Sequence, residues 1–212
     1  MRELSAGLRL PEAVCSVLAA RGITAVPDAK RFLRPRMDQL HDPASLADGP
    51  LAADRIVRAI RAGETMLVHG DYDVDGICAT ALLTRWLRTF GGKVVPFVPH
   101  RLRDGYDFSE AGLIVAREAS AGLIVTADCG TLAHETVRRA RASGIDVVVT
   151  DHHTVGSELP DAVAVVNPRR PDCLYPEKGL CGTGLAYKLC GLIRATLGAP
   201  PGALEEYLDL VA

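Results

Sequence analysis

The chain alternates short apolar segments with longer amphipathic ones from about residue 65 onward, and this alternation limits the possible folds more than any other feature. The short segments are typical of buried strands, and the longer ones have apolar residues at helical spacing. Strands joined through helices pair in parallel. The sequence therefore predicts an α/β fold, an open, mainly parallel five-stranded sheet with helices on both faces. Strands are predicted at 65–68, 93–98, 123–126, 146–150 and 162–166, and helices at 77–88, 107–118, 132–142 and 182–197.

The residues before this alternation form a separate segment. Helices are predicted at 11–21, 27–33 and 51–62, and the stretch from residue 34 to residue 50 is irregular and rich in proline, aspartate and glycine. We therefore expect a short helical N-terminal arm at residues 1–50, followed by the α/β domain at residues 51–212.

Composition excludes several classes of protein. The net charge is −2, so a polyanion would have to be held by local arginines or by metal rather than by a general basic surface. No apolar run approaches the ~18 residues of a membrane span. The six cysteines form no CxxC pair, and they are interpreted as small buried residues of a protein in the reducing cytoplasm. A structural zinc site formed by Cys173, Cys181 and Cys190 is the alternative.

The segment between the first predicted strand and its helix reads HGDYDVDG, at residues 69–76. It places one imidazole and three carboxylates within seven residues. Carboxylates this close resist ionisation unless a counter-charge is present, and a divalent cation would supply it. His69, Asp73 and Asp75 would then offer one nitrogen and two oxygen ligands. The alternative is a solvated acidic turn in which Asp73 or Asp75 caps the helix.

Two further predicted strands end in residues that can bind metal. The third strand is followed by Asp128, and the fourth is followed by Asp151, His152 and His153. Because sites in open parallel sheets form at the carboxyl ends of the strands, these side chains are expected to meet. This coincidence favours a metal site over a solvated turn. Asp151 is expected to orient His152 or to cap the turn.

The number of candidate ligands suggests two ions about 3.5–4 Å apart, an arrangement that stabilises both oxygens of a phosphoryl displacement. Mixed carboxylate and imidazole ligands favour Mn²⁺ over Mg²⁺ and leave Zn²⁺ open. No serine, cysteine or lysine nucleophile is required. The residues alone therefore predict metal-assisted hydrolysis of a phosphoester, without indicating the substrate. The candidate ligands are His69, Asp73, Asp75, Asp128 and His152.

Two other groups are expected at the same edge of the sheet. Arg101 follows the second predicted strand, and Gly182, Thr183 and Gly184 open the last helix, where free amides can hold an anion. The alternative for Arg101 is a solvated turn. For the glycines it is close packing of the helix against the sheet.

The motifs, in this order, resemble the DHH phosphoesterase superfamily, and in more detail its RecJ branch, the bacterial single-strand-specific exonucleases. The resemblance extends from about residue 50 to the last residue. The superfamily motifs are HGDYDVDG, ADCG at 127–130 and TDHH at 150–153. The motifs closer to RecJ are VPHR at 98–101, NP at 167–168, YPEKGLCGTGLAYKL at 175–189 and LDLVA at 208–212.

This resemblance implies a DHH catalytic domain that hydrolyses single-stranded DNA from 5′ to 3′ in repair and recombination, with two Mn²⁺ or Mg²⁺ ions. It implies catalytic roles for Asp75, Asp128 and His153, with His153 facing the scissile phosphate. Arg101 would lie near the DNA 5′-phosphate, and residues 182–184 would contact substrate. The implied ligands are His69, Asp73 and Asp128 for one ion, and Asp75, Asp128, His152 and Asp209 for the other.

Members of this family continue beyond LDLVA into a linker helix, a second substrate-binding domain and usually an OB-fold. The chain is therefore interpreted as the N-terminal catalytic portion, with impaired activity alone. A single-strand-binding protein or a helicase is a candidate partner, and no membrane is expected. Two alternatives remain: a DHH enzyme acting on short oligonucleotides, cyclic dinucleotides or pyrophosphate, and a non-catalytic binding module. The motifs around Arg101 and Gly182 argue against the first, and the complete ligand set argues against the second.

Overall fold

In the computed structural model, which describes residues 2–200 and 204–211, the chain divides into two units, Met1–His41 and Asp42–Ala212. The first unit contains α1 (Arg2–Leu8), α2 (Glu12–Ala20) and α3 (Val26–Leu33). The predicted helices at 11–21 and 27–33 correspond to α2 and α3, whereas α1 was not predicted. A small apolar cluster of its own holds this unit together, formed by Leu4, Cys15, Leu18 and Ala29. The assignment of residues 1–50 to an N-terminal arm and of residues 51–212 to a catalytic domain stays a prediction.

The second unit contains the predicted sheet. The strand order is β2-β1-β3-β4-β5, and every pairing is parallel. The predicted fold class and the open five-stranded parallel sheet are therefore confirmed. The elements are α4 (Gly49–Ala62), β1 (Thr65–Gly70), α5 (Val74–Thr89), β2 (Lys93–Phe97), α6 (Glu110–Glu118), β3 (Leu123–Ala127), α7 (His134–Ala142), β4 (Asp146–Thr150), β5 (Ala164–Val166), α8 (Gly182–Leu197) and α9 (Leu208–Val211). Short 3₁₀ turns occupy Met37–Gln39, Pro43–Ser45 and Leu204–Tyr207.

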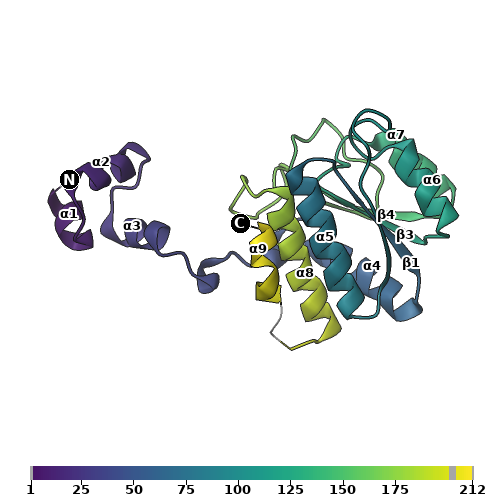
Figure 1. Ribbon diagram of the computed structural model, residues 1–212, viewed down its shortest axis with the longest axis horizontal. Coiled ribbons are helices and arrows are strands. Elements are labelled where there is room, and N and C mark those ends of the chain that lie inside the picture. The colour runs from purple at the N-terminus through teal and green to yellow at the C-terminus, as the bar shows by residue number, and fades with distance from the viewer. Residues whose placement is uncertain (1, 201–203, 212) are drawn as a thin grey trace. The chain divides into compact units, whose positions relative to one another are not determined.

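Helices cover both faces of the sheet (Figure 1), and the side chains on its two faces belong to different apolar clusters. Met66 and Val68 of β1 pack with α4, α5 and α8, whereas Leu67 packs with α6 and α7. Because successive residues of a strand point to opposite faces, a strand buried on both sides reads as a continuous apolar run. The prediction of helices on both faces is confirmed by this division.

The strand order places a topological switch between β1 and β3, because the chain moves outward from β1 to β2 and then returns to the other side of β1. Ligand sites in open α/β sheets form at such a point, beyond the carboxyl ends of the strands. Gly70 at the end of β1 lies opposite Ala127 at the end of β3, and an isolated bridge joins Cys129 to Thr150. The segments that follow β1, β3 and β4 therefore meet at one edge.

One boundary differs from the prediction for a local reason. The helix expected to begin at Asp107 begins at Glu110. Asp107 has a φ of 71°, in the left-handed region, which does not belong to a right-handed helix. Its Oδ1 accepts hydrogen bonds from Phe108 N at 2.8 Å and from Gly130 N at 2.6 Å. Asp107 thereby ties the start of α6 to the segment that follows β3.

The cysteines occupy separate positions. Cys173 Sγ accepts a hydrogen bond from Ala47 N at 3.4 Å, Cys181 Sγ accepts one from Gly184 N at 3.3 Å at the start of α8, and Cys190 is buried in the core. Among the described residues, no potential metal-binding group includes a cysteine. Within residues 2–200 and 204–211, no helix is long and apolar enough to cross a membrane.

Candidate metal centre

Asp128 follows the last residue of β3 and lies at the centre of the carboxyl edge. Its φ of 68° is in the left-handed region, which aspartate tolerates better than most residues. The residue is 1% exposed, and neither carboxylate oxygen has a hydrogen-bond partner within the described part of the chain. His152 Nε2 lies 3.0 Å from Oδ1, and this ring supplies a positive charge only when it is protonated. A buried carboxylate in this state needs a positive counter-charge.

The electrostatic surroundings of Asp128 lead to the same conclusion. Burial, together with the negative charges of Asp75, Asp73, Asp151 and Asp71, raises the pKa of Asp128 to about 8. Without a cation, the protonated form of Asp128 therefore dominates at neutral pH. A bound cation would favour the ionised form, because a carboxylate coordinates metal without its proton.

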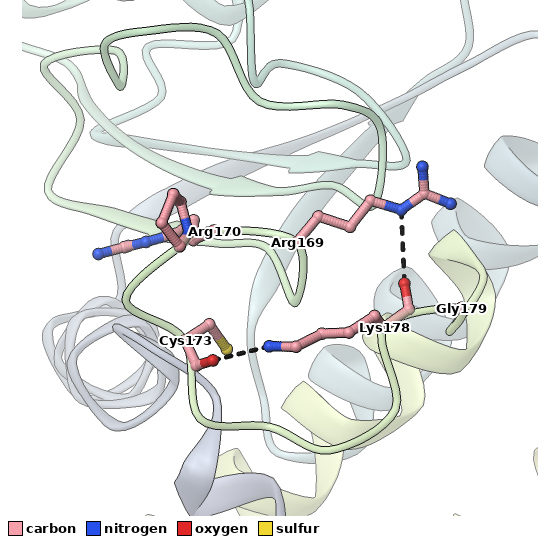
Figure 2. A pocket seen from close by; sticks show the side chains of 6 residues that line it. Arg169, Arg170, Cys173, Lys178 and Gly179 are labelled. Carbon is pink, nitrogen blue, oxygen red and sulfur yellow. Dashed lines mark hydrogen bonds between the residues drawn. The ribbon is translucent and has the colours of Figure 1, made fainter.

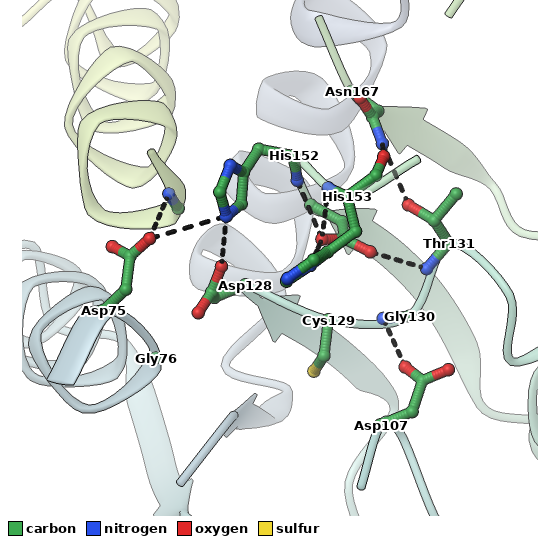
Figure 3. A network of polar contacts seen from close by, with 12 residues as sticks. Asp75, Gly76, Asp107, Asp128, Cys129, Gly130, Thr131, His152, His153 and Asn167 are labelled. Carbon is green, nitrogen blue, oxygen red and sulfur yellow. Dashed lines mark hydrogen bonds and ion pairs between the residues drawn. The ribbon is translucent and has the colours of Figure 1, made fainter. Parts of the chain in front are cut away.

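Among the described residues, two groups of side chains have ligand atoms close enough to hold a cation. Asp71, Asp73 and Asp128 form the first group, and Asp128, His152 and His153 form the second. Within each group the ligand atoms lie within 4.8 Å of one another. Asp128 belongs to both groups, and Figure 3 shows it beside the two histidines. Oxygen and imidazole donors of this kind fit Mn²⁺ or Mg²⁺.

The turn between β1 and α5 supplies the first group. Asp73 is the N-cap of α5, and its Oδ1 accepts a hydrogen bond from Gly76 N at 3.0 Å. The capping role considered for Asp73 and its place near Asp128 are therefore compatible. Asp71 is 2% exposed and was not assigned a role from the sequence, although it belongs to the acidic series of HGDYDVDG. Burial raises the pKa of Asp71 as well.

His69 lies outside both groups. Its ring is buried against Phe97 and Phe108, with ring centroids 5.2 and 5.1 Å away. Nδ1 is 3.7 Å from Cys129 Sγ, and Nε2 has no hydrogen-bond partner within the described residues. A Cβ placed on Gly112 of α6 would be only 2.5 Å from Nε2. The ring therefore faces the α6 side of the sheet, and its role as a metal ligand stays a prediction.

We expect the His69 ring to remain neutral until the pH falls to about 4, because burial lowers its pKa from 6.5 to that value. Since the unfolded chain takes up this proton near 6.5, His69 destabilises the fold progressively as the pH falls through that window. Nitrogen NMR of the ring, assigned with the His69→Gln variant, measures the titration. Protonation of this signal near 6.5 would show that the ring is solvated.

Asp75 binds the start of α8, far away in the sequence. Its carboxylate accepts hydrogen bonds from Gly182 N at 2.7 Å, from Thr183 N at 2.7 Å and from Thr183 Oγ1 at 2.6 Å. Burial alone would raise the pKa of Asp75, but these hydrogen bonds outweigh it and hold the pKa below its ordinary value. His152 Nε2 is 3.6 Å from Asp75 Oδ2.

The amides predicted to hold an anion thus hold a carboxylate of the chain itself. Gly182 also packs against Asp128, because a Cβ at this position would lie 2.6 Å from both Cβ and Cγ of Asp128. Close packing of α8 against Asp128, the alternative considered from the sequence, therefore explains why a glycine occupies position 182. Contact of Gly182, Thr183 and Gly184 with substrate stays a prediction.

Gly182→Ala is expected to weaken Mn²⁺ binding by tenfold or more, because the added methyl group forces the Asp128 carboxylate from its position. The matched control is Gly191→Ala in the same helix, where the nearest atoms to the new Cβ are 4.0 Å away. Calorimetry of Mn²⁺ binding to both variants checks the prediction. Equal affinities would show that Asp128 is free to move.

Asp209 lies on α9 and shares a pocket of about 440 Å³ with Asp75 and Thr183. The pocket is also lined by Val74, Cys78, Cys181, Leu210 and Val211. Neither group of potential ligands includes Asp209, so its role as a ligand stays a prediction. Ala212, the last residue of the LDLVA motif, lies outside the described residues.

Asp151 positions the second histidine of the centre. The residue is 2% exposed, and its Oδ1 accepts hydrogen bonds from His152 N at 2.7 Å, His153 N at 3.1 Å and His153 Nδ1 at 2.7 Å. Its Oδ2 accepts one from Thr131 N at 3.0 Å. Asp151 therefore caps the turn, as considered from the sequence, but the ring that it orients is that of His153 rather than His152.

The backbone of His153 is held by Asn167, for which the sequence predicts no role beyond its place in the NP motif. The fully buried Asn167 side chain donates to His153 O and to Thr131 Oγ1, each at 3.0 Å. Figure 3 shows this network from Asp75 to Asn167. Asn167 and Asp107 thus support the centre without belonging to either ligand group.

Arg101 is connected to the centre through two tyrosines. Its guanidinium lies over the Tyr72 ring, 5.1 Å from the centroid, and Tyr72 meets Tyr106 edge-on at 6.1 Å. Tyr106 Oη is 3.4 Å from His153 Nε2. Arg101 is exposed, so the solvated turn considered from the sequence describes its surroundings. Its contact with a 5′-phosphate stays a prediction.

Comparison with known proteins identifies the family of the chain. The family model described as "DHH family, N-terminal domain" matches residues 65–212. The chain is 36% identical to the single-stranded-DNA-specific exonuclease RecJ of Bacillus subtilis (strain 168) over its whole length, and spans 26% of that protein. It is 41% identical to RecJ of Thermus thermophilus over 76% of the chain and 23% of the relative.

Solved structures give the same result. The crystal structure of Thermus thermophilus RecJ in complex with Mn²⁺ matches 99% of the chain and 29% of that protein, with a TM-score of 0.78 and 34% identity. A structure of exonuclease RecJ bound to manganese matches 78% of the chain and 42% of that protein, with a TM-score of 0.71 and 38% identity. The chain spans about a quarter of the length of the two sequence relatives. The chain belongs to the DHH family.

Proposed function

We propose that this chain is a metal-dependent phosphodiesterase that removes nucleotides from the 5′ end of single-stranded DNA. The observation that carries the proposal is Asp128, a buried carboxylate without a hydrogen-bond partner that is shared by two groups of potential ligands. Similarity to proteins named as single-stranded-DNA-specific exonucleases supports the choice of substrate.

Mn²⁺ or Mg²⁺ would be held by Asp71, Asp73 and Asp128 on one side, and by Asp128, His152 and His153 on the other. When bound, ions in such sites stabilise the negative charge that develops on the phosphoryl oxygens. The structures of RecJ relatives with Mn²⁺ and with Mg²⁺ support both metals as candidates. Whether His69, Asp75 and Asp209 complete these sets remains the prediction from the family.

The chain's own residues prepare the centre in three ways. Asp151 accepts the Nδ1–H of His153, so in the neutral ring the lone pair remains on Nε2, available as a ligand or a proton acceptor. Gly182 and Thr183 hold the Asp75 carboxylate beside His152. The low exposure of Asp128 excludes water from part of the site, which strengthens every charge interaction there.

The surface beside the centre supports a strand-like substrate. Tyr106 is 53% exposed next to His153, and Arg101 lies over Tyr72. Exposed aromatic rings with an adjacent arginine are a common arrangement for binding unpaired bases and phosphates. A 5′ to 3′ direction, a role in DNA repair and a cytoplasmic location remain part of the proposal. So do a single-strand-binding protein or a helicase as partners.

The test uses single-stranded oligonucleotides labelled at either end, a duplex, a dinucleotide, a cyclic dinucleotide and pyrophosphate, each with Mn²⁺, Mg²⁺ or EDTA. The expected result is release of mononucleotides from the 5′ end of the single strand with metal only. Preferential cleavage of the short substrates would assign the chain to a different branch of the family. Binding of the strand without cleavage in either metal would identify a binding module.

A further inference from the structure

A loop at the carboxyl edge of the sheet carries positively charged side chains that lie outside both groups of potential metal ligands. Residues 167–181 connect β5 to α8, and part of this loop surrounds a pocket of about 600 Å³ (Figure 2). The lining residues are Arg169, Arg170, Pro171, Cys173, Lys178 and Gly179.

The two arginines of this pocket differ in their pairing. Arg170 is neutralised by ion pairs with Asp48 at 2.5 Å and Asp172 at 2.6 Å. Arg169 Nε donates to Lys178 O at 3.4 Å, and its terminal nitrogens have no hydrogen bond or ion pair within the described residues. Figure 2 shows the two side chains extending in opposite directions. Arg169 thus keeps an unneutralised charge and free N–H groups.

Hydrogen bonds within the loop hold the segment that contacts Arg169. Lys178 Nζ donates to Pro168 O at 2.8 Å and to Cys173 O at 2.7 Å. These hydrogen bonds hold Lys178 in place, and its backbone carbonyl accepts the hydrogen bond from Arg169 Nε. Glu177, the acidic neighbour on this segment, has its Oε1 engaged by Gly179 N at 2.8 Å. Because the hydrogen bond to Lys178 O already restricts the Arg169 guanidinium, less conformational entropy is lost when it binds a ligand.

The same loop is tied to the metal centre at both ends. Asn167 Oδ1 accepts from Arg169 N at 2.9 Å, while its Nδ2 donates to the backbone of His153. At the other end, Gly182 N donates to Asp75. Arg169 therefore lies next to the proposed site of hydrolysis.

We propose that Arg169 binds a phosphodiester of the nucleic-acid strand next to the scissile phosphate, with Lys178 as the residue that positions the loop. The inference rests on the proposed function, since it assigns a subsite to that reaction. A planar guanidinium with free N–H groups suits a phosphate, which it can contact through two parallel hydrogen bonds. The phosphate belongs to the strand and contributes affinity without reading the base sequence.

The experiment compares Arg169→Ala, Arg169→Lys and Arg58→Ala with the parent chain. Arg58 is an exposed arginine on α4, a helix that ends at the amino edge of the sheet, so its loss removes the same charge away from the site. Binding of a phosphorothioate oligonucleotide, which resists hydrolysis, is measured in Mn²⁺ over a series of salt concentrations. Hydrolysis of the normal oligonucleotide gives KM and kcat in the same buffers.

Arg169→Ala is expected to weaken binding and raise KM about tenfold, with kcat nearly unchanged. The slope of log affinity against log salt should fall by about 0.7, the value for one phosphate contact on a single strand. Arg169→Lys should retain the slope, and Arg58→Ala should behave like the parent chain. Inorganic phosphate should compete only weakly if the site takes a phosphodiester of the strand.

The outcomes separate this inference from the proposed function. Hydrolysis that proceeds with unchanged KM and salt slope in Arg169→Ala would overturn the subsite and leave the phosphodiesterase intact. Binding that depends on Arg169 without any hydrolysis would overturn the enzyme and leave the phosphate subsite. An equal loss of affinity in Arg58→Ala would show a general charge effect and would also overturn the subsite.

Discussion

Asp128→Asn is expected to abolish metal-dependent hydrolysis, with a loss of at least about a thousandfold. Asp128 is shared by both groups of potential ligands, so the substitution removes one negatively charged ligand from each. Amide oxygen is a weaker ligand than carboxylate for a divalent cation. Calorimetry should show that the binding of Mn²⁺ is weakened at every site, and a variant with one metal site of unchanged affinity would contradict the shared role.

The same substitution is expected to stabilise the metal-free protein at high pH. The pKa of Asp128 in the folded protein is about 8, against an ordinary value of 3.8. Between these values the folded state holds a proton that the unfolded state has released, so stability falls as the pH rises through this window. Asp128→Asn removes this contribution, and its melting temperature at pH 8 in EDTA should exceed that of the parent chain by several degrees.

The control for both effects is Asp54→Asn, which removes an exposed carboxylate from α4. It should change neither metal binding nor the pH dependence of melting. The burial of Asp71 and the partial burial of Asp107 also raise the pKa of each, so the pH dependence of stability in Asp128→Asn should become shallower without disappearing. A melting temperature that is unchanged in EDTA would show that Asp128 is better solvated than its 1% exposure indicates.

Asp151→Asn is expected to lower the free energy of unfolding by about 2–4 kcal/mol and to reduce activity at least about a hundredfold. The two oxygens of Asp151 accept four hydrogen bonds, from Thr131 N, His152 N, His153 N and His153 Nδ1. An asparagine of the same shape must place its NH₂ group against at least one of these donors. With the amide oxygen at the Oδ1 position, the NH₂ group faces Thr131 N, and His153 Nδ1 donates to a neutral oxygen instead of a charged one, which weakens the contact that selects its tautomer.

This effect has a defined pH dependence. Burial alone would raise the pKa of Asp151, but its hydrogen bonds to Thr131 and His153 outweigh burial and keep the pKa below 3.8. The stabilisation from Asp151 is therefore present above 3.8 and is lost as the pH falls through the lower folded value. Chemical denaturation at neutral pH measures the change in unfolding free energy, and kinetics are recorded well below the variant's melting temperature.

The matched control is Asp161→Asn, because Asp161 is an exposed acidic residue that pairs with Arg141 on the surface. Surface ion pairs contribute little, so this variant should melt and react like the parent chain. Loss of activity in Asp151→Asn with an unchanged free energy of unfolding would mean that Asp151 acts on His153 alone. Unchanged activity in a destabilised variant would remove His153 from the proposed mechanism.

The sequence by itself determined the sheet and the edge at which the centre forms. Five buried strands separated by helices leave little choice of architecture, because apolar runs of this length must be covered on both faces. Parallel pairing then brings Asp128 and His152 to the same edge, whatever the details of the connecting segments. Neither conclusion depends on contacts between particular side chains.

Only the tertiary structure decided which residues meet at that edge. His69 and Asp71 are two positions apart, yet His69 is packed between Phe97 and Phe108 while Asp71 joins Asp73 and Asp128. The strand continues to Gly70, so the His69 side chain still follows the alternation that sends Leu67 to the α6 face. The chain turns immediately afterwards. The local sequence pattern could not predict that His69 and Asp71 point to different sites, because the turn between them depends on how α5 packs.

The pairing of Asp75 with Gly182 and Thr183 has the same origin. These residues are 107 and 108 positions apart, and their contact exists because α5 and α8 pack together on one face of the sheet. From the sequence, a helix N-terminus offers free amides to any anion. In the folded protein these amides bind the carboxylate of Asp75. Because Gly182 has no side chain, α8 approaches Asp128 closely enough for Asp75 to reach the amides of Gly182 and Thr183.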